Sequence, residues 1–172
     1  EIDNMKKIVC IILALSLPFL LFACSSTTPK QITVAEAGYS CNADILYGEE
    51  LSMNVAIKAI GGGLFSLKVN TPEDISGLTF SFDNSEMTVS YKDDLAAHNI
   101  SPEYGGFAEI LNEVFLKFTT SRPNVPFKEG AYVFEGDNAD YSFTVVFNEQ
   151  GFPLSLTVPE ENLTATFSNW KY

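Results

Sequence analysis

The residue best placed for a covalent reaction is Cys24, which ends the sequence Leu21-Phe22-Ala23-Cys24 directly behind an apolar segment. The basic start Met5-Lys6-Lys7 and the apolar run over 8–22 are organised like a secretory signal. That run is shorter than the roughly 20 apolar residues that a comfortable membrane-spanning helix needs. A cysteine in this position is typical of signals that are cleaved only after a diacylglyceryl group is attached to the thiol. We therefore predict that Cys24 is lipidated and that residues 1–23 are removed as a signal peptide.

A lipid on Cys24 would determine where the protein works. Two acyl chains are enough for stable anchoring, so the predicted partner is a membrane and the predicted location is the outer face of the cytoplasmic membrane. Residues 24–31 are polar and suit a tether, and Met5 is the expected start, because the acidic residues before it do not fit a signal. The alternatives are an ordinary cysteine behind a cleaved signal, or a weak membrane anchor over 8–23.

Charge and cysteine content narrow the classes of protein. The chain has 22 acidic and 10 basic residues and a net charge of −12, which argues against nucleic-acid binding and against adsorption onto anionic headgroups. Residues 32–172 are long enough for one domain. After maturation Cys41 would have no cysteine partner, and it alternates in phase with Tyr39 and Ile45. We therefore expect Cys41 to be a small buried apolar residue.

Residues that could carry catalysis are few. His98 is the single histidine, and we expect it in a polar loop over 93–101, without the surroundings of a triad or a metal-binding helix. The acidic pairs stand at predicted turns, and the segment from Asp137 to Asp140 lacks the spacing of a calcium loop. The sequence therefore predicts no enzyme, no metal site and no cofactor.

Strict alternation of apolar and polar residues predicts most of the secondary structure. Half-buried strands are expected at 51–59 and 65–69, joined by Gly61-Gly62-Gly63, and at 78–82 and 87–91, joined by the turn after Asp83. The remaining strands are expected at 39–47, 131–135, 141–148, 153–158 and 163–169. Short connections between them predict a mostly antiparallel sheet with meander topology.

One segment, residues 103–120, has the periodicity of a helix instead. Its apolar residues form one stripe, and Pro123 lies beyond its end. The fold class that follows is α+β, mainly antiparallel β: a curved half-barrel sheet of about nine strands with one amphipathic helix packed on its concave face.

The size of that sheet relative to its helix suggests where a ligand could bind. Either the sheet curls tightly and fills its own interior, in which case the aromatic residues are plain core, or an apolar cavity remains beneath the helix. The candidate ligand-binding residues are Phe65, Phe80, Phe82, Phe107, Leu111, Phe115, Phe118, Phe143 and Phe147.

Three stretches of the chain carry a resemblance to a known family. These are Pro72 to Phe80, Gly151 to Leu156 and Thr166 to Trp170. They resemble lipoproteins common in clostridia and related Gram-positive bacteria, which are similar in fold to the lipoprotein-localisation carriers LolA and LolB. The resemblance spans roughly Thr33 to Tyr172 and implies a half-barrel with a helical lid over a hydrophobic cavity that takes acyl chains.

Two functions follow as expectations. The first is an anchored extracytoplasmic lipoprotein that binds an acyl chain, lipid or lipoprotein moiety in its half-barrel. The second is a non-enzymatic envelope adaptor that binds a protein partner in cell-wall or sporulation processes, with a filled barrel as its scaffold.

Overall fold

The computed structural model describes residues 29–31, 38–60, 63–83, 86–92, 94–100, 106–121 and 123–172. The predicted lipidation of Cys24, the signal segment and most of the tether lie outside these residues, as does part of the predicted turn at Gly61-Gly62-Gly63.

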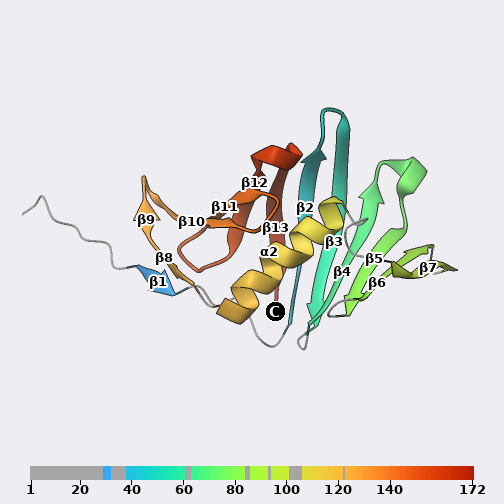
Figure 1. Ribbon diagram of the computed structural model, residues 1–172, viewed down its shortest axis with the longest axis horizontal. Coiled ribbons are helices and arrows are strands. Elements are labelled where there is room, and N and C mark those ends of the chain that lie inside the picture. The colour runs from blue at the N-terminus through green and yellow to red at the C-terminus, as the bar shows by residue number, and fades with distance from the viewer. Residues whose placement is uncertain are drawn as a thin grey trace, which may run out of the picture.

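Most of the described chain forms one open antiparallel sheet of 11 strands in the order β7-β6-β5-β4-β3-β2-β13-β12-β11-β10-β9. Figure 1 shows this sheet curving around the helix α2 (Phe107–Ser121). The predicted fold class is therefore confirmed. The strands are β2 (Tyr39–Tyr47), β3 (Leu51–Ile60), β4 (Leu64–Thr71), β5 (Leu78–Asp83), β6 (Glu86–Tyr91), β7 (Asp94–Ile100), β9 (Phe127–Lys128), β10 (Ala131–Asp137), β11 (Ser142–Phe147), β12 (Pro153–Val158) and β13 (Leu163–Lys171).

Smaller elements complete the described structure. The strands β1 (Lys30–Gln31) and β8 (Asn124–Val125) pair in a separate two-stranded sheet. Short 3₁₀ turns, η1 (Glu73–Ile75) and η3 (Pro159–Glu161), follow β4 and β12. No helix among the described residues has both the length and the apolar character required to cross a bilayer.

The sheet consists of two meanders, and their connection explains where the helix lies. Strands β2 to β7 form one meander and β9 to β13 the other, and the pairing of β13 with β2 joins them. The first meander ends at one edge of the sheet and the second begins at the opposite edge. The chain must therefore return across the sheet between them, and α2 makes that crossing over the concave face (Figure 1). At 15 residues the helix is about 22 Å long, enough to span several strands.

All nine predicted strands are present, and β7 and β9 are additional. The prediction of a polar loop over 93–101 was wrong, because β7 occupies Asp94–Ile100 and includes His98. That segment lacks clean alternation, and as the terminal strand of the sheet it pairs with β6 alone, with two shifts of register. An edge strand of this kind leaves a weak signature in the sequence. The helix begins at Phe107, four residues later than predicted.

The alternation seen in the sequence separates the two faces of the sheet. In β3, for example, Met53, Val55 and Ile57 are buried, whereas Asn54 is half-buried and Lys58 is exposed. Among the described residues no polar or charged side chain is buried. The concave face and the apolar stripe of α2 therefore form one continuous apolar interior.

Candidate functional site

The candidate site is the layer of aromatic side chains between α2 and the concave face of the sheet. At the start of the helix, the Phe107 ring lies edge-on to Phe80 of β5, with 5.5 Å between ring centroids. In the middle, Phe115 lies 5.7 Å from Phe65 of β4 and 5.4 Å from Phe167 of β13. Such tilted and edge-to-face pairs are favourable geometries for aromatic rings. The start and the middle of the helix are therefore held to strands of both meanders.

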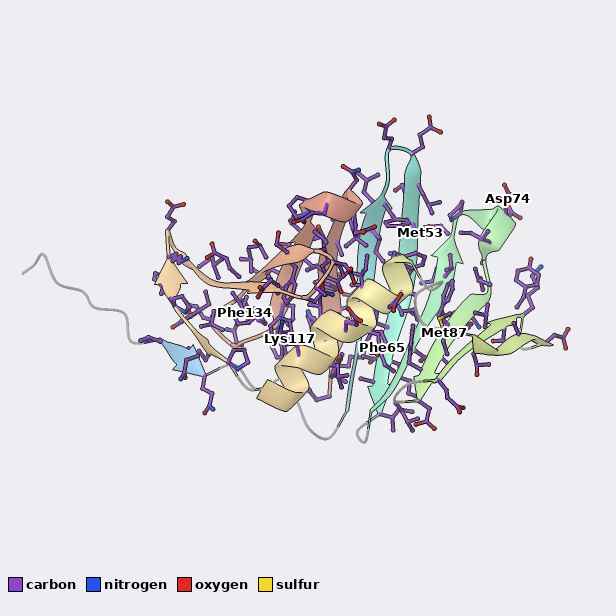
Figure 2. All side chains as sticks on the ribbon, in the orientation of Figure 1. Met53, Phe65, Asp74, Met87, Lys117 and Phe134 are labelled. Atoms are coloured by element: carbon purple, nitrogen blue, oxygen red, sulfur yellow. The ribbon has the colours of Figure 1, made fainter. Side chains whose placement is uncertain are left out.

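The end of the helix is held by a second aromatic group. Phe118 makes edge contacts at 5.3 Å with Phe134 of β10 and at 5.1 Å with Phe147 of β11. Beside it, Phe143 lies opposite Gly136 in the β10–β11 pairing, where an added Cβ would stand 2.5 Å from the Phe143 ring. Glycine at this position lets the ring lie flat over the strand. Figure 2 labels Phe65 and Phe134 in different halves of the sheet, with α2 between them in this view.

All nine candidate ligand-binding residues belong to this interior. Eight of them are buried, with exposed fractions of at most 7%, and Phe80 is half-buried. Three surface grooves of the described residues are lined by side chains other than these nine. The nine side chains thus lie together and pack closely, and their contact with a ligand stays a prediction. An acyl chain inserted between these rings would displace their contacts with one another.

The sequence did not point to one important member of this layer, Trp170. Its ring stacks on Phe152 at 5.8 Å and lies 5.6 Å from Tyr39 and 6.3 Å from Phe115, and its Nε1 donates a hydrogen bond to the Pro153 carbonyl oxygen at 3.1 Å. Period-two alternation from Phe167, which is buried, would turn Trp170 to the other face. A β-bulge between Ser168 and Lys171 reverses the phase, and such a bulge leaves no periodic signal.

A polar latch ties the outer side of α2 to the β10–β11 turn. The carboxylate of Glu113 accepts hydrogen bonds from the Tyr141 hydroxyl at 2.5 Å and from the Asn138 amide at 2.9 Å. One turn further along, the Lys117 ammonium donates to the Asp137 carbonyl oxygen and lies 5.3 Å from the centroid of the Phe143 ring. Burial, and then the bond to Glu113, raise the pKa of Tyr141 well above its ordinary value. The phenol therefore stays protonated and remains a donor.

At the β5–β6 end of the interior, apolar side chains are less completely covered. Leu78, Phe80 and Val89 share the concave face and are half-buried, and Phe80 and Val89 are direct cross-strand partners. This strip adjoins the start of α2 through the contact between Phe80 and Phe107. Part of its apolar surface is therefore accessible from outside the interior.

The described thiol of this interior, Cys41, is buried and unreactive. Burial raises the pKa of the Cys41 thiol to about 12, so the sulfur stays protonated and is a poor nucleophile at neutral pH. Cys41 is 3% exposed, as expected from its phase in β2. No group of three or more potential metal-ligating side chains occurs among the described residues.

Comparison with known proteins gives similarity of structure only. No protein-family model matches the sequence, and no curated protein is similar to it. The chain is similar in structure to a LolA superfamily protein. That protein, from Nitrosomonas europaea, is 7% identical, with 82% of this chain and 88% of that chain covered and a TM-score of 0.38.

Two further solved structures are similar to a comparable degree. An outer membrane lipoprotein-sorting protein domain from Vibrio parahaemolyticus is 10% identical, covering 81% of this chain and 86% of that chain, with a TM-score of 0.46. A DUF1329 family protein from Desulfovibrio piger is 13% identical, covering 80% of this chain and 86% of that chain, with a TM-score of 0.45.

Proposed function

We propose that this protein binds a hydrophobic ligand, an acyl chain of a lipid or lipoprotein, between α2 and the concave face of the sheet. The observation that carries the proposal is that one helix covers an interior without any buried polar side chain among the described residues, and touches it through aromatic rings. These aromatic contacts can rearrange without breaking hydrogen bonds, so the bonds of Glu113 and Lys117 to the β10–β11 turn are the polar contacts that lid movement would break. A single helix attached in this way is suited to act as a lid.

The energies involved permit such a movement. Each methylene group removed from water contributes about 0.8 kcal/mol, so an acyl chain of about 12 methylene groups would gain about 10 kcal/mol. Separating one aromatic pair loses about 0.5–1.5 kcal/mol beyond area burial. The gain from the acyl chain must offset these lost ring contacts and the roughly 4–15 kcal/mol that association costs, and about 10 kcal/mol is of the size needed. The half-buried strip at Leu78, Phe80 and Val89 is the proposed route of access.

The test uses Trp170, the single tryptophan of the chain, as a reporter inside the aromatic layer. A fragment of residues 29–172 is titrated with a dibrominated fatty acid, whose bromine atoms quench indole fluorescence on close contact. We expect saturable quenching, and we expect the non-brominated acid to compete with it. The proposal fails if quenching does not saturate, or if the brominated acid acts no differently on the urea-unfolded fragment.

Two variants separate lid opening from non-specific adsorption. Tyr141→Phe removes the hydroxyl that bonds Glu113 and should speed the onset of quenching, because the latch must break for α2 to move. Leu116→Ala shortens a side chain that is 43% exposed and should leave the rate unchanged. Equal rates in both variants and the wild type would show that α2 is not the lid.

We further propose that the protein is a lipoprotein anchored at the outer face of the cytoplasmic membrane through Cys24. The support is the sequence around that cysteine. Cells expressing the full chain are fed an alkyne-labelled fatty acid, and label should enter the wild type and the Cys10→Ala variant but not Cys24→Ala. Label retained in Cys24→Ala would refute the anchor.

A second candidate function is suggested by the edge of the sheet. The seven-residue strand β7 pairs only with β6 among the described strands, and an open edge can accept an extended segment from another protein. Crosslinking in the native membrane distinguishes this envelope adaptor from a lipid-binding protein. A stoichiometric protein partner linked at β7, with no acyl ligand bound, would favour the adaptor.

A further inference from the structure

A second concavity lies on the face of the sheet that is turned away from α2. It is a groove of about 780 Å³ across β13, β2, β3, β4 and β5. Its floor includes Ser40, Asn42, Ala56 and Ser66, which alternate along their strands with the buried residues that face the helix. These four are half-buried although no helix among the described residues covers them, because the twist of the sheet shelters them. Cys41, Ile57 and Trp170, whose side chains belong to the hydrophobic interior, also line the groove. The groove therefore lies behind that interior and meets it at Trp170.

Three lysines gather in this groove. Strand register places Lys171, Ser40, Lys58 and Ser66 in one row across β13, β2, β3 and β4. Lys58 and Lys171 are thus two strands apart, at about 10 Å. Lys68 is the diagonal neighbour of Lys58, at about 7–8 Å between such positions. Flexible stems of this length allow all three ammonium groups to reach one bound group.

The β-bulge in β13 is what brings the third lysine to this face. Between the paired residues Ser168 and Lys171, two residues of β13 stand opposite one residue of β2. Asn169 absorbs the extra residue with a φ of 56°, a conformation that asparagine tolerates better than most side chains. Without the bulge, alternation from Phe167 would turn Lys171 toward the interior. The same distortion that turns Trp170 toward the aromatic layer therefore completes the basic cluster.

These three ammonium groups have no partners within the described residues. They make no hydrogen bond, ion pair or ring contact there, although the chain has 22 acidic side chains that could have supplied one. Like charges at neighbouring positions of a sheet repel and destabilise it. By contrast, the other described lysines each contact a carbonyl oxygen, a carboxylate or an aromatic ring; these are Lys30, Lys92, Lys117 and Lys128.

The carboxylates on this face stand outside the groove. Asp44 lies one row beyond Asn42 and accepts a hydrogen bond from the Asn54 amide at 2.7 Å, and Asn54 in turn accepts one from the Asn70 amide at 2.9 Å. Asp83 is at the far end of β5, paired with Leu64. Neither acidic residue lines the groove. The groove is thus a positive site on a strongly negative chain.

We propose that this groove binds a phosphate group carried by a hydroxyl-rich ligand. The three ammonium groups supply charge for the phosphate, and Ser40, Asn42, Ser66, Thr79 and Asn169 offer hydroxyl and amide groups for neighbouring ligand hydroxyls. Ala56 stands between Asn42 and Lys68 in the next row, and its small side chain leaves the space for the ligand. The inference does not rest on the hydrophobic site, which lies on the opposite face.

The surroundings of the groove suit two sources of that phosphate, a lipid headgroup or a soluble molecule. A smaller groove of about 340 Å³ continues from the first and shares Ser40, Lys58 and Lys171 with it. That extension is also lined by Ile60, which is 52% exposed, and Tyr172, which is 63% exposed. Apolar side chains at this end could contact acyl chains while the lysines hold the headgroup.

The experiment uses the full chain, purified as the expressing cell processes it and kept in a nonionic detergent. Calorimetry measures binding of glycerol 3-phosphate and, separately, of monomeric dihexanoyl-phosphatidylglycerol. We expect at least one probe to bind, with about five-fold weaker binding for each of Lys58→Gln and Lys68→Gln. Ala56→Ile, which fills the space but keeps every charge, should also weaken binding. Lys128→Gln removes a lysine paired with Glu135 elsewhere and should bind like the wild type.

Each outcome either tests the proposal or identifies the source of the phosphate group. Binding of glycerol 3-phosphate supports a soluble ligand, whereas binding of the short lipid alone, weakened by Ile60→Ser, supports a headgroup. The proposal is overturned if neither probe binds at millimolar concentration, if the lysine variants bind like the wild type, or if Lys128→Gln weakens binding as much as they do. Trp170 fluorescence confirms that each variant is folded. Because Trp170 also lines this groove, binding at the hydrophobic site is measured by calorimetry with a fatty acid instead. That binding should be unchanged in all of these variants, so failure here leaves the hydrophobic site untouched.

Discussion

Replacing Phe115 with alanine should be the most damaging single change on the helix, because this ring links α2 to three strands. The side chain is 2% exposed, and its ring lies within 5.4–6.3 Å of the rings of Tyr39, Phe65, Phe167 and Trp170. Truncation of a buried phenylalanine to alanine typically destabilises a protein by about 3–5 kcal/mol. Four aromatic contacts, each contributing about 0.5–1.5 kcal/mol, place this site in the upper part of that range.

The free energy of unfolding should therefore fall by about 4 kcal/mol, a large share of the roughly 5–15 kcal/mol typical of a domain. With a urea dependence of about 2 kcal/mol per molar, the unfolding midpoint should move down by about 2 M. Trp170 fluorescence reports the aromatic layer itself, and circular dichroism at the helical band reports α2. Both signals should shift together if the helix and the sheet unfold as one unit.

The neighbouring side chain supplies a matched control. Leu116 is 43% exposed on the same helix, and Leu116→Ala should change the free energy of unfolding by less than about 0.5 kcal/mol. Phe115→Leu should fall between the two variants, because it keeps much of the apolar volume. A loss below about 1 kcal/mol for Phe115→Ala, or a loss equal to that of Leu116→Ala, would refute the reasoning that α2 is held by this ring.

Three more predictions concern hydrogen bonds and protonation. Tyr141→Phe should reduce the protection of α2 amides from hydrogen exchange while the amides of the sheet keep their protection, because a hydrogen bond to the Glu113 carboxylate contributes about 1.5–3 kcal/mol. An equal loss of protection in α2 and in the sheet would contradict a local latch. Burial raises the pKa of Cys41 from 9.0 to about 12, so the unfolded chain loses this proton at a lower pH than the folded chain. The stability contributed by the protonated thiol is therefore complete below pH 9 and declines as the pH rises toward 12. Thiol labelling located by peptide mapping should be slow at Cys41 until the protein unfolds. The Ser142 hydroxyl holds the pKa of Glu160 below its ordinary value through a hydrogen bond of 2.7 Å. Ser142→Ala should therefore raise the pKa of Glu160 in an NMR titration. An unchanged pKa would show that this hydrogen bond is not the cause of the shift.

The sequence by itself determined most of the local structure of this protein. In β3 and β4 the alternation of apolar and polar residues identified both strands and the faces that they bury, because side chains on a strand alternate with period two wherever it pairs. The apolar stripe of α2 likewise identified the helix, from Phe107 to Phe118, and the face that packs on the sheet. The candidate site residues could be selected for the same reason, since each of them lies in phase either on the concave side of the sheet or on the apolar stripe of α2. The role of Cys24 is also a matter of local sequence, and it stays a prediction.

Only the tertiary structure decided how these elements enclose space and where charge gathers. Whether the interior is open or filled depends on how far the sheet curls and where α2 crosses it, and that follows from the non-local pairing of β13 with β2. The bulge at Asn169 reverses the phase of Trp170 and Lys171, and a single left-handed residue has no periodic signature. Lys58 and Lys68 lie on neighbouring strands of one hairpin, but Lys171 is far from them in the chain and joins them only through the register of β13, β2, β3 and β4. Periodicity describes one strand at a time, whereas cavities and charge clusters are properties of which strands meet and in what register.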